Sequence, residues 1–181
     1  MLRLKAEGCL SRLGGLFPSC GNSFVPMKPE QLAAVEHRLG HWLPEDYKAF
    51  ASIYGNSRFD HLVGQRVSPG RTVFVSSFYG GDGELDDACK ISWAIRVYEG
   101  RMPATVIPIA ECAEQGEICL GVSGLEAEKV YFWDRSQEWA ALEEECLRER
   151  RVFPPETRFQ NMTKLADSFE GFLCGLEIID E

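Results

Sequence analysis

The sequence predicts an α+β fold, a single domain in which helices flank one antiparallel or mixed β-sheet. Segments with helical periodicity occur towards both ends of the chain, and short segments rich in β-branched and aromatic residues are clustered between them. In addition, 181 residues with 45% apolar content are sufficient to bury one self-sufficient core.

Five segments have the apolar periodicity of helices, and they lie at about residues 29–39, 44–54, 85–99, 136–150 and 163–176. Pro29 suits the first turn of the first helix, and Gly40 ends it. In the last segment, Thr163 is the expected N-cap and Gly175 the expected stop.

Four short segments favour strands, and they lie at about residues 72–78, 105–110, 117–122 and 129–133. Turn-forming residues bound each segment, and the short connections between the later ones favour antiparallel neighbours. The stretch 57–71 contains Gly64, Pro69 and Gly70, so it is expected to be a loop.

The chain is acidic, with 28 Asp and Glu against 19 Lys and Arg and a formal net charge of −9. Such a charge repels phosphate backbones, so direct nucleic-acid binding is disfavoured and a basic protein partner is favoured. No run of about 18 uninterrupted apolar residues occurs, and we therefore expect no membrane-spanning segment.

Seven cysteines are present, an odd number, and no C-x-x-C motif occurs. A secreted disulfide framework usually has an even count in dense clusters, so we expect free thiols in a reducing, cytoplasmic environment. Near the N-terminus, Glu7 and Arg12 interrupt any apolar stretch typical of a signal peptide. Because Gly14 and Pro18 break a long helix, residues 1–23 are expected to form a loosely held arm.

No motif for catalysis, metal binding or cofactor binding is complete. His37 and His41 have the spacing of zinc ligands on a helix, but Gly40 separates them and no third ligand is near. Residues 82–93 lack the glycine and the glutamate of a calcium loop. We therefore expect no cofactor, no metal and no catalytic residues, although carboxylates that the fold brings together remain open as a site.

Several segments taken together resemble one family. EHRLGHWLPEDYKAF at residues 36–50 is followed by VIPIA at 106–110, GEICL at 116–120, KVYFWD at 129–134 and LADSFEGFL at 165–173. Their order and spacing over about residues 28–176 resemble the SUKH superfamily. That superfamily includes yeast regulators of cell-wall synthesis and many bacterial immunity proteins.

The resemblance implies a non-catalytic function. Bacterial members of the family bind a cognate toxin, often a nuclease, inside the producing cell and block it. This implies an immunity protein of a polymorphic toxin system that neutralises a basic cognate toxin by occluding it. The acidic composition fits, because a nuclease toxin must be basic to hold its substrate. Two other functions remain open: a regulatory scaffold without a toxin partner, and an enzyme with an unrecognised carboxylate site.

The chain departs from the family pattern at two places. The arm of residues 1–23 is additional to the SUKH-like domain, which comprises residues 24–181. An acidic helical insertion at about residues 135–161 separates the Tyr-Phe-Trp-Asp strand from the Ser-Phe helix. The resemblance implies that variable segments of this kind determine which partner a family member binds.

The expected partner-binding residues are mostly acidic. One group lies at the turn that follows the first strand, with Tyr79 as a possible aromatic anchor, and the other lies in the insertion. The residues are Tyr79, Asp82, Glu84, Asp86, Asp87, Glu143, Glu144 and Glu145. The alternative for each group is a solvated surface that keeps the protein soluble.

Overall fold

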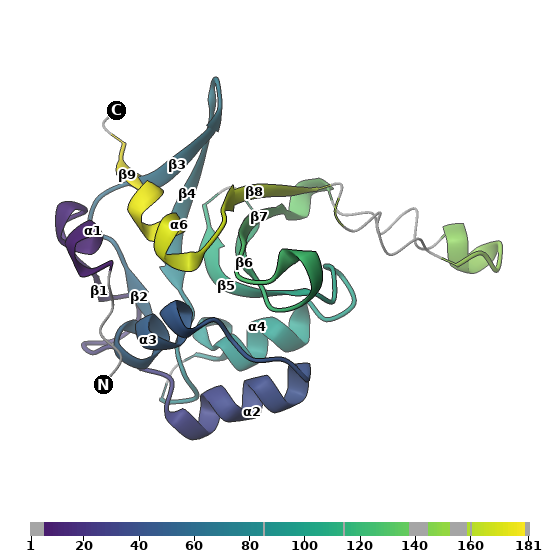
Figure 1. Cartoon of the computed structure of the whole chain (residues 1–181), viewed down its shortest axis with the longest axis horizontal. Coiled ribbons are helices and arrows are strands. Elements are labelled where there is room, and N and C mark those ends of the chain that lie inside the picture. Colours follow the sequence, from purple (N-terminus) through teal and green to yellow (C-terminus); the bar gives the residue numbers. More distant parts are fainter. Residues whose placement is uncertain are drawn as a thin grey trace.

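The structure, a computed structural model, describes residues 6–84, 86–113, 115–137, 145–152, 159 and 161–179. It confirms the single α+β domain: within these residues a nine-stranded, mostly antiparallel sheet is covered by helices (Figure 1). In this part of the chain no helix is long and apolar enough to cross a lipid bilayer.

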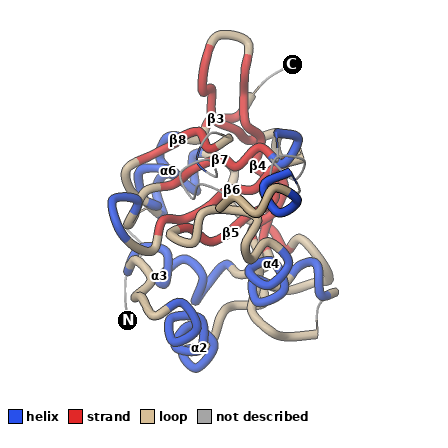
Figure 2. Tube along the Cα trace, turned by 90° about the vertical axis from the view of Figure 1, so that its right-hand side faces the viewer, coloured by secondary structure: helices blue, strands red, loops and turns tan. Residues whose placement is uncertain are grey.

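The sheet has the strand order β1-β2-β4-β5-β6-β7-β8, and β3 and β9 join it beside β4. The strands are β1 (Phe17–Pro18), β2 (Ser57–Arg58), β3 (Val63–Ser68), β4 (Arg71–Phe78), β5 (Val106–Cys112), β6 (Gly116–Gly121), β7 (Val130–Asp134), β8 (Met162–Ala166) and β9 (Glu177–Ile178). Strand β4 pairs with β3 through its first half and with β5 through its second half, so it belongs to both parts of the sheet. The β3–β4 hairpin extends beyond the rest of the sheet (Figure 2).

The helices with defined bounds are α1 (Glu7–Arg12), α2 (Pro29–Leu39), α3 (Glu45–Tyr54), α4 (Ile91–Val97) and α6 (Phe169–Gly175). Helix α2 has the predicted bounds, with Pro29 in its first turn and Gly40 in the left-handed region at φ 69°. Its neighbour α3 also matches the prediction closely.

Aromatic side chains join α3, α6 and the sheet into one core. The ring of Phe50 lies 4.7 Å from that of Phe78 and 5.0 Å from that of Phe169, measured between ring centroids. Tyr47 contacts Phe169 edge-on at 5.3 Å. These rings are all nearly inaccessible to solvent, so they pack in the core.

Two sequence predictions of secondary structure are wrong. Residues 162–166 form strand β8 beside β7, so the last helix begins only at Phe169 and Thr163 is not its N-cap. Ser168 caps α6 instead, because its Oγ accepts a hydrogen bond from the Gly171 amide at 3.0 Å. Likewise, the expected loop 57–71 contains strands β2 and β3.

The third predicted helix is also shorter than expected. Lys90 has an extended conformation, with ψ at 134°, and it separates the 3₁₀ turn Asp87–Cys89 from α4. One face of α4 and its C-cap is buried, and its residues are Ile91, Ala94, Ile95 and Tyr98. The chain therefore forms an exposed loop where the start of the helix was predicted.

The described part of the N-terminal segment, residues 6–23, is not loosely held. Leu10 and Leu13 are 4% and 1% exposed, and α1 packs against α6. Arg12 donates hydrogen bonds to the carbonyl oxygens of Cys174 and Leu176 at the C-terminal end of α6. A disulfide joins Cys9 to Cys174, so the expectation of free thiols is wrong for these two cysteines, and it is confirmed for Cys20, Cys89, Cys112, Cys119 and Cys146.

The predicted acidic helix of residues 136–150 falls partly outside the described residues, because 138–144 are not described. Residues 135–137 form a 3₁₀ turn and residues 145–148 are helical. The insertion and the domain boundary at residue 24 both stay predictions.

Candidate partner-binding surface

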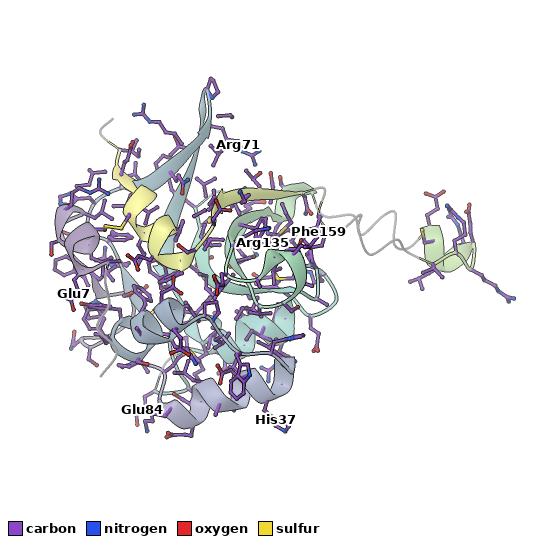
Figure 3. The ribbon with its side chains drawn as sticks, in the orientation of Figure 1. Glu7, His37, Arg71, Glu84, Arg135 and Phe159 are labelled. Carbon is purple, nitrogen blue, oxygen red and sulfur yellow. A yellow bond between two sulfur atoms is a disulfide. The ribbon has the colours of Figure 1, made fainter. Side chains whose placement is uncertain are left out.

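Four exposed carboxylates lie on the loop between β4 and α4, which we call the acidic loop (residues 81–90). They belong to Asp82, Glu84, Asp86 and Asp87, and all four predicted residues are exposed. The structure therefore brings this predicted group together on one short segment. Figure 3 shows Glu84 beside the N-terminal end of α2, whereas His37 lies towards the other end of that helix.

Hydrogen bonds hold the backbone of the acidic loop against α2 and the segment before it. The Gly81 amide donates to the Val25 carbonyl at 2.9 Å. The Gln31 side chain bridges the two elements: its Oε1 accepts from the Lys28 amide at 2.8 Å, and its Nε2 donates to the Asp82 carbonyl at 3.2 Å. One glutamine thus caps the first turn of α2 and positions the start of the loop.

The other end of the loop is held by the end of β4. The Gly80 amide donates to the Cys89 carbonyl at 2.9 Å, and the Ile91 amide donates to the Gly80 carbonyl at 3.0 Å. A side chain at position 81 would collide with backbone, since a Cβ there would lie 2.7 Å from the Pro26 carbonyl oxygen. Glycine is therefore required for the loop to approach α2 this closely.

The charges on the loop differ in how they are compensated. Asp87 pairs with Lys90 at 2.9 Å, and this contact lowers the pKa of the Asp87 carboxyl and raises the pKa of Lys90. Asp82 accepts a hydrogen bond from the Ser92 hydroxyl. Glu84 and Asp86 have no ion-pair partner within the described part of the chain, so they present unpaired negative charge to solvent.

An apolar groove lies next to the acidic loop, between α2 and α4. We call it the α2–α4 groove; its volume is about 190 Å³. Its lining residues are Met27, Gln31, Ala34, Val35, Arg38, Gly81, Asp82, Ile91, Ser92 and Ile95. Asp82 belongs to both features, so negative charge borders a largely apolar surface. Beyond Arg38 and Ile95 a second hollow of about 210 Å³ continues towards Glu99, which pairs with Arg38 at 2.8 Å.

Trp42 was not identified by the sequence analysis, and it is the described aromatic side chain with the largest exposure. It is 80% exposed in the turn between α2 and α3 and lines a hollow of about 390 Å³ together with His37 and His41. Exposed tryptophans are enriched at the centres of protein interfaces. Its exposure could have been inferred, since Trp42 follows Gly40, the glycine that ends α2, and therefore lies in a turn.

Tyr79 is buried and is not available as an aromatic anchor. Its side chain is 6% exposed, and its hydroxyl donates to Glu117 Oε2 at 2.6 Å. Arg135 Nη1 donates to the Tyr98 hydroxyl at 3.0 Å, and Arg135 Nε lies 3.5 Å from Glu117 Oε1. We call these four side chains the Glu117 network; Arg135 is labelled in Figure 3.

Burial dominates the electrostatics of the Glu117 network. Glu117 is 0% exposed, and this desolvation raises its pKa to about 7 in spite of hydrogen bonds from Tyr79 and Tyr98 and the nearby charge of Arg135, which all lower it. Burial and the carboxylate also raise the pKa of Tyr79 far above its usual value. Because Glu117 is buried within this network, its carboxyl group is not open to a ligand.

The second predicted acidic group is only partly described. Glu143 and Glu144 lie outside the described residues. Glu145 is helical, and its carboxylate lies 3.8 Å from the guanidinium of Arg151. Figure 1 draws residues 145–152 apart from the body of the domain.

In the described ranges, no group of three or more His, Cys, Asp or Glu side chains is arranged to hold a metal ion. His37 lies within α2, whereas Gly40 ends the helix before His41, as the sequence indicated. The surface features are therefore a charged loop, an apolar groove and an exposed tryptophan. Such features suit contact with a macromolecule.

Comparison with known proteins agrees with the resemblance noted in the sequence. Residues 26–175 match the model of the SMI1 / KNR4 family (SUKH-1), a family of toxin-immunity proteins. The chain is also 29% identical over 140 residues to YokK, an SPbeta prophage-derived uncharacterized protein of Bacillus subtilis (strain 168). That alignment covers 66% of this chain and 65% of the relative's length. Because the family match covers most of the sequence, the chain belongs to the SMI1 / KNR4 family (SUKH-1).

Proposed function

We propose that this protein is an immunity protein that binds a basic protein toxin and covers the surface through which the toxin acts. Family membership supports this class of function. The observation that carries the choice of surface is the acidic loop itself, with exposed carboxylates on a backbone that is held in place beside an apolar groove.

Charge on the loop favours rapid capture of a basic partner. A toxin that acts on nucleic acid carries a positive surface to hold phosphates, and Glu84 and Asp86 offer that surface unpaired carboxylates. Complementary charge of this kind mainly raises the association rate and suppresses wrong partners. Fast association suits an inhibitor that must reach its toxin before the toxin reaches its substrate.

The anchoring of the loop lowers the entropic penalty of binding. Gln31, Val25 and Gly80 hold the loop backbone at three places, so little chain ordering is needed when a partner docks. Preorganisation of this kind increases affinity because fewer degrees of freedom are lost on association.

Apolar contact would supply the buried centre that charge alone does not provide. The α2–α4 groove has the size to receive one or two side chains of a partner, and Asp82 at its edge suits an arginine or lysine whose stem lies in the groove. Trp42, exposed in the turn after α2, offers a further apolar contact. A standard interface of about 1,600 Å² would include these features together.

Two matched charge-reversal variants test the proposal. Glu84→Lys combined with Asp86→Lys is expected to weaken binding to a basic toxin encoded beside this gene by at least about tenfold, mainly through a slower and less salt-dependent association rate. The measurements are surface plasmon resonance at two salt concentrations and survival of cells that co-express the toxin.

The control variant reverses the same number of negative charges at a different place on the surface. Asp60→Lys combined with Glu177→Lys also reverses two exposed carboxylates, but both residues lie outside the acidic loop and the groove. It is expected to bind and protect like the unchanged protein. Full protection and unchanged kinetics in the loop variant would show that the acidic loop is not the binding surface. A gene neighbourhood without a toxin would favour the regulatory scaffold instead.

A further inference from the structure

The four partly exposed cysteines lie in two pairs, and each pair joins the N-terminal segment to the rest of the domain. Cys9 is bonded to Cys174. Cys20 and Cys89 have free thiols, and their Sγ atoms are 2.9 Å apart. The other cysteines are buried, and they are Cys112, Cys119 and Cys146.

The backbone on both sides of the Cys20–Cys89 pair is already held in place. Asn56 is 1% exposed, and its Nδ2 donates to the Cys20 carbonyl at 2.8 Å. The backbone carbonyl of Asn56 accepts from the Ser19 amide at 3.0 Å. On the other side, the Cys89 carbonyl accepts from the Gly80 amide at 2.9 Å. The two sulfurs are thus brought together by the fold itself.

Bond formation needs only a small movement. The Sγ atoms are 2.9 Å apart in the thiol form, against about 2.05 Å for a disulfide bond. The sulfurs must therefore approach by less than about 1 Å to reach bonding distance.

We propose that Cys20 and Cys89 are a redox-modification site that forms a second intramolecular disulfide by exchange with a low-molecular-weight disulfide such as oxidised glutathione. The inference does not depend on the proposed toxin partner. A disulfide here links residues 69 positions apart in sequence and ties the N-terminal segment to the base of the acidic loop.

The exchange takes two steps. In the first, the Cys20 sulfur attacks one sulfur of the oxidant, a mixed disulfide forms, and one thiol is released with the proton from Cys20. In the second, the Cys89 sulfur attacks the Cys20 sulfur, the second thiol leaves, and it takes the proton from Cys89. Two electrons pass from the cysteine pair to the oxidant, which is reduced to two thiols.

Burial, followed by the contact with Cys20, raises the pKa of the Cys89 thiol to about 12. At neutral pH Cys89 is therefore protonated. The second step then depends on deprotonation of Cys89, so closure of the disulfide is expected to become faster as pH rises.

The test uses the full chain equilibrated in mixtures of oxidised and reduced glutathione, followed by alkylation of remaining thiols and peptide mapping without reduction. The expected result is one peptide pair that joins Cys20 to Cys89, in addition to the pair that joins Cys9 to Cys174. Formation of the new link is expected to raise the melting temperature by roughly 5–15 °C over a Cys20→Ser variant treated in the same way.

Two variants and one control sharpen the result. Cys20→Ser and Cys89→Ser are each expected to abolish the link and leave Cys9–Cys174 intact. Cys119→Ala, which removes a free but fully buried thiol, is expected to retain it. Absence of a Cys20–Cys89 peptide in the unchanged protein would overturn the proposal. So would a persistent glutathione adduct on Cys20 beside a free Cys89.

Discussion

Replacement of Glu117 by glutamine is expected to remove a strong pH dependence from the stability of this fold. Glu117 is 0% exposed, and its pKa is raised by burial from the usual 4.5 to about 7. The folded protein therefore retains a proton on this carboxyl over a pH range in which the unfolded chain has lost it. Glutamine has a similar shape and no charge at any pH, so it imitates the protonated form.

The direction of the effect follows from which state binds more protons. Between pH 4.5 and about 7 the folded state holds the Glu117 proton and the unfolded state does not, so stability falls as pH rises. The contribution is fully present below the unfolded pKa and is lost as pH rises through the folded pKa. From about pH 5 to about pH 8 the expected loss is about 2–3 kcal/mol, since each pKa unit corresponds to about 1.4 kcal/mol.

Urea unfolding followed by tryptophan fluorescence measures this loss directly. The free energy of unfolding of the unchanged protein is expected to fall relative to that of Glu117→Gln across this pH range. Glu177→Gln is the control, because Glu177 lies in β9 with an exposed side chain and does not contribute to the pKa shift of Glu117. Its pH profile is expected to run parallel to that of the unchanged protein.

Two results would refute the reasoning. Parallel profiles for Glu117→Gln and the unchanged protein would mean that Glu117 has an ordinary pKa in the fold. A relative rise in the stability of the unchanged protein with pH would mean that Arg135 and the two tyrosines outweigh burial and hold the carboxylate ionised.

Three further changes test a close backbone approach, the disulfide and a helix cap. Gly81→Ala is expected to displace the acidic loop and lower stability by about 1–3 kcal/mol, because the new Cβ would lie 2.7 Å from the Pro26 carbonyl oxygen. A thermal melt measures this loss. Gly8→Ala is the control, since a Cβ at Gly8 would have no atom within 4 Å. Cys9→Ser is expected to lower the free energy of unfolding by about 2–4 kcal/mol in non-reducing buffer, and equal stability of both proteins there would contradict a structural disulfide. Ser168→Ala is expected to cost about 1 kcal/mol by loss of the α6 cap, whereas Ser168→Asp retains the cap; urea titration separates the two.

Local signals predicted the elements that have clear start and stop residues. Helix α2 lies between Pro29 and Gly40 as expected, because proline at the first turn and glycine in the left-handed region act through the local backbone alone. The strands β4, β5, β6 and β7 were also predicted, since each is a short run of β-branched or aromatic residues between turns.

Elements that depend on a distant partner were assigned wrongly. The apolar positions in residues 162–166 suit a helix as well as a strand. These residues form a strand because they pair with the edge of β7 in antiparallel register. Strand β3 contains Gly64, a turn residue by sequence. In the fold, a Cβ at Gly64 would lie 2.6 Å from the Val73 carbonyl oxygen, so glycine serves the close approach of β4.

The candidate surface could be predicted in its charge and not in its shape. Four carboxylates within six positions are visible in the sequence, and their exposure follows from their charge. The burial of Tyr79 could not be foreseen, because its partner Glu117 is 38 residues away and is itself a charged residue that sequence reasoning places on the surface. The α2–α4 groove likewise depends on how two helices pack.

The N-terminal segment connects the part of the chain outside the family match with the proposed binding surface. The family model begins at residue 26, yet Leu10, Leu13 and the Cys9–Cys174 bond make the preceding residues part of the core. The same segment then runs past the acidic loop, where Val25 accepts from the Gly81 amide and Cys20 contacts Cys89. A change in this additional segment is therefore expected to alter the position of the acidic loop.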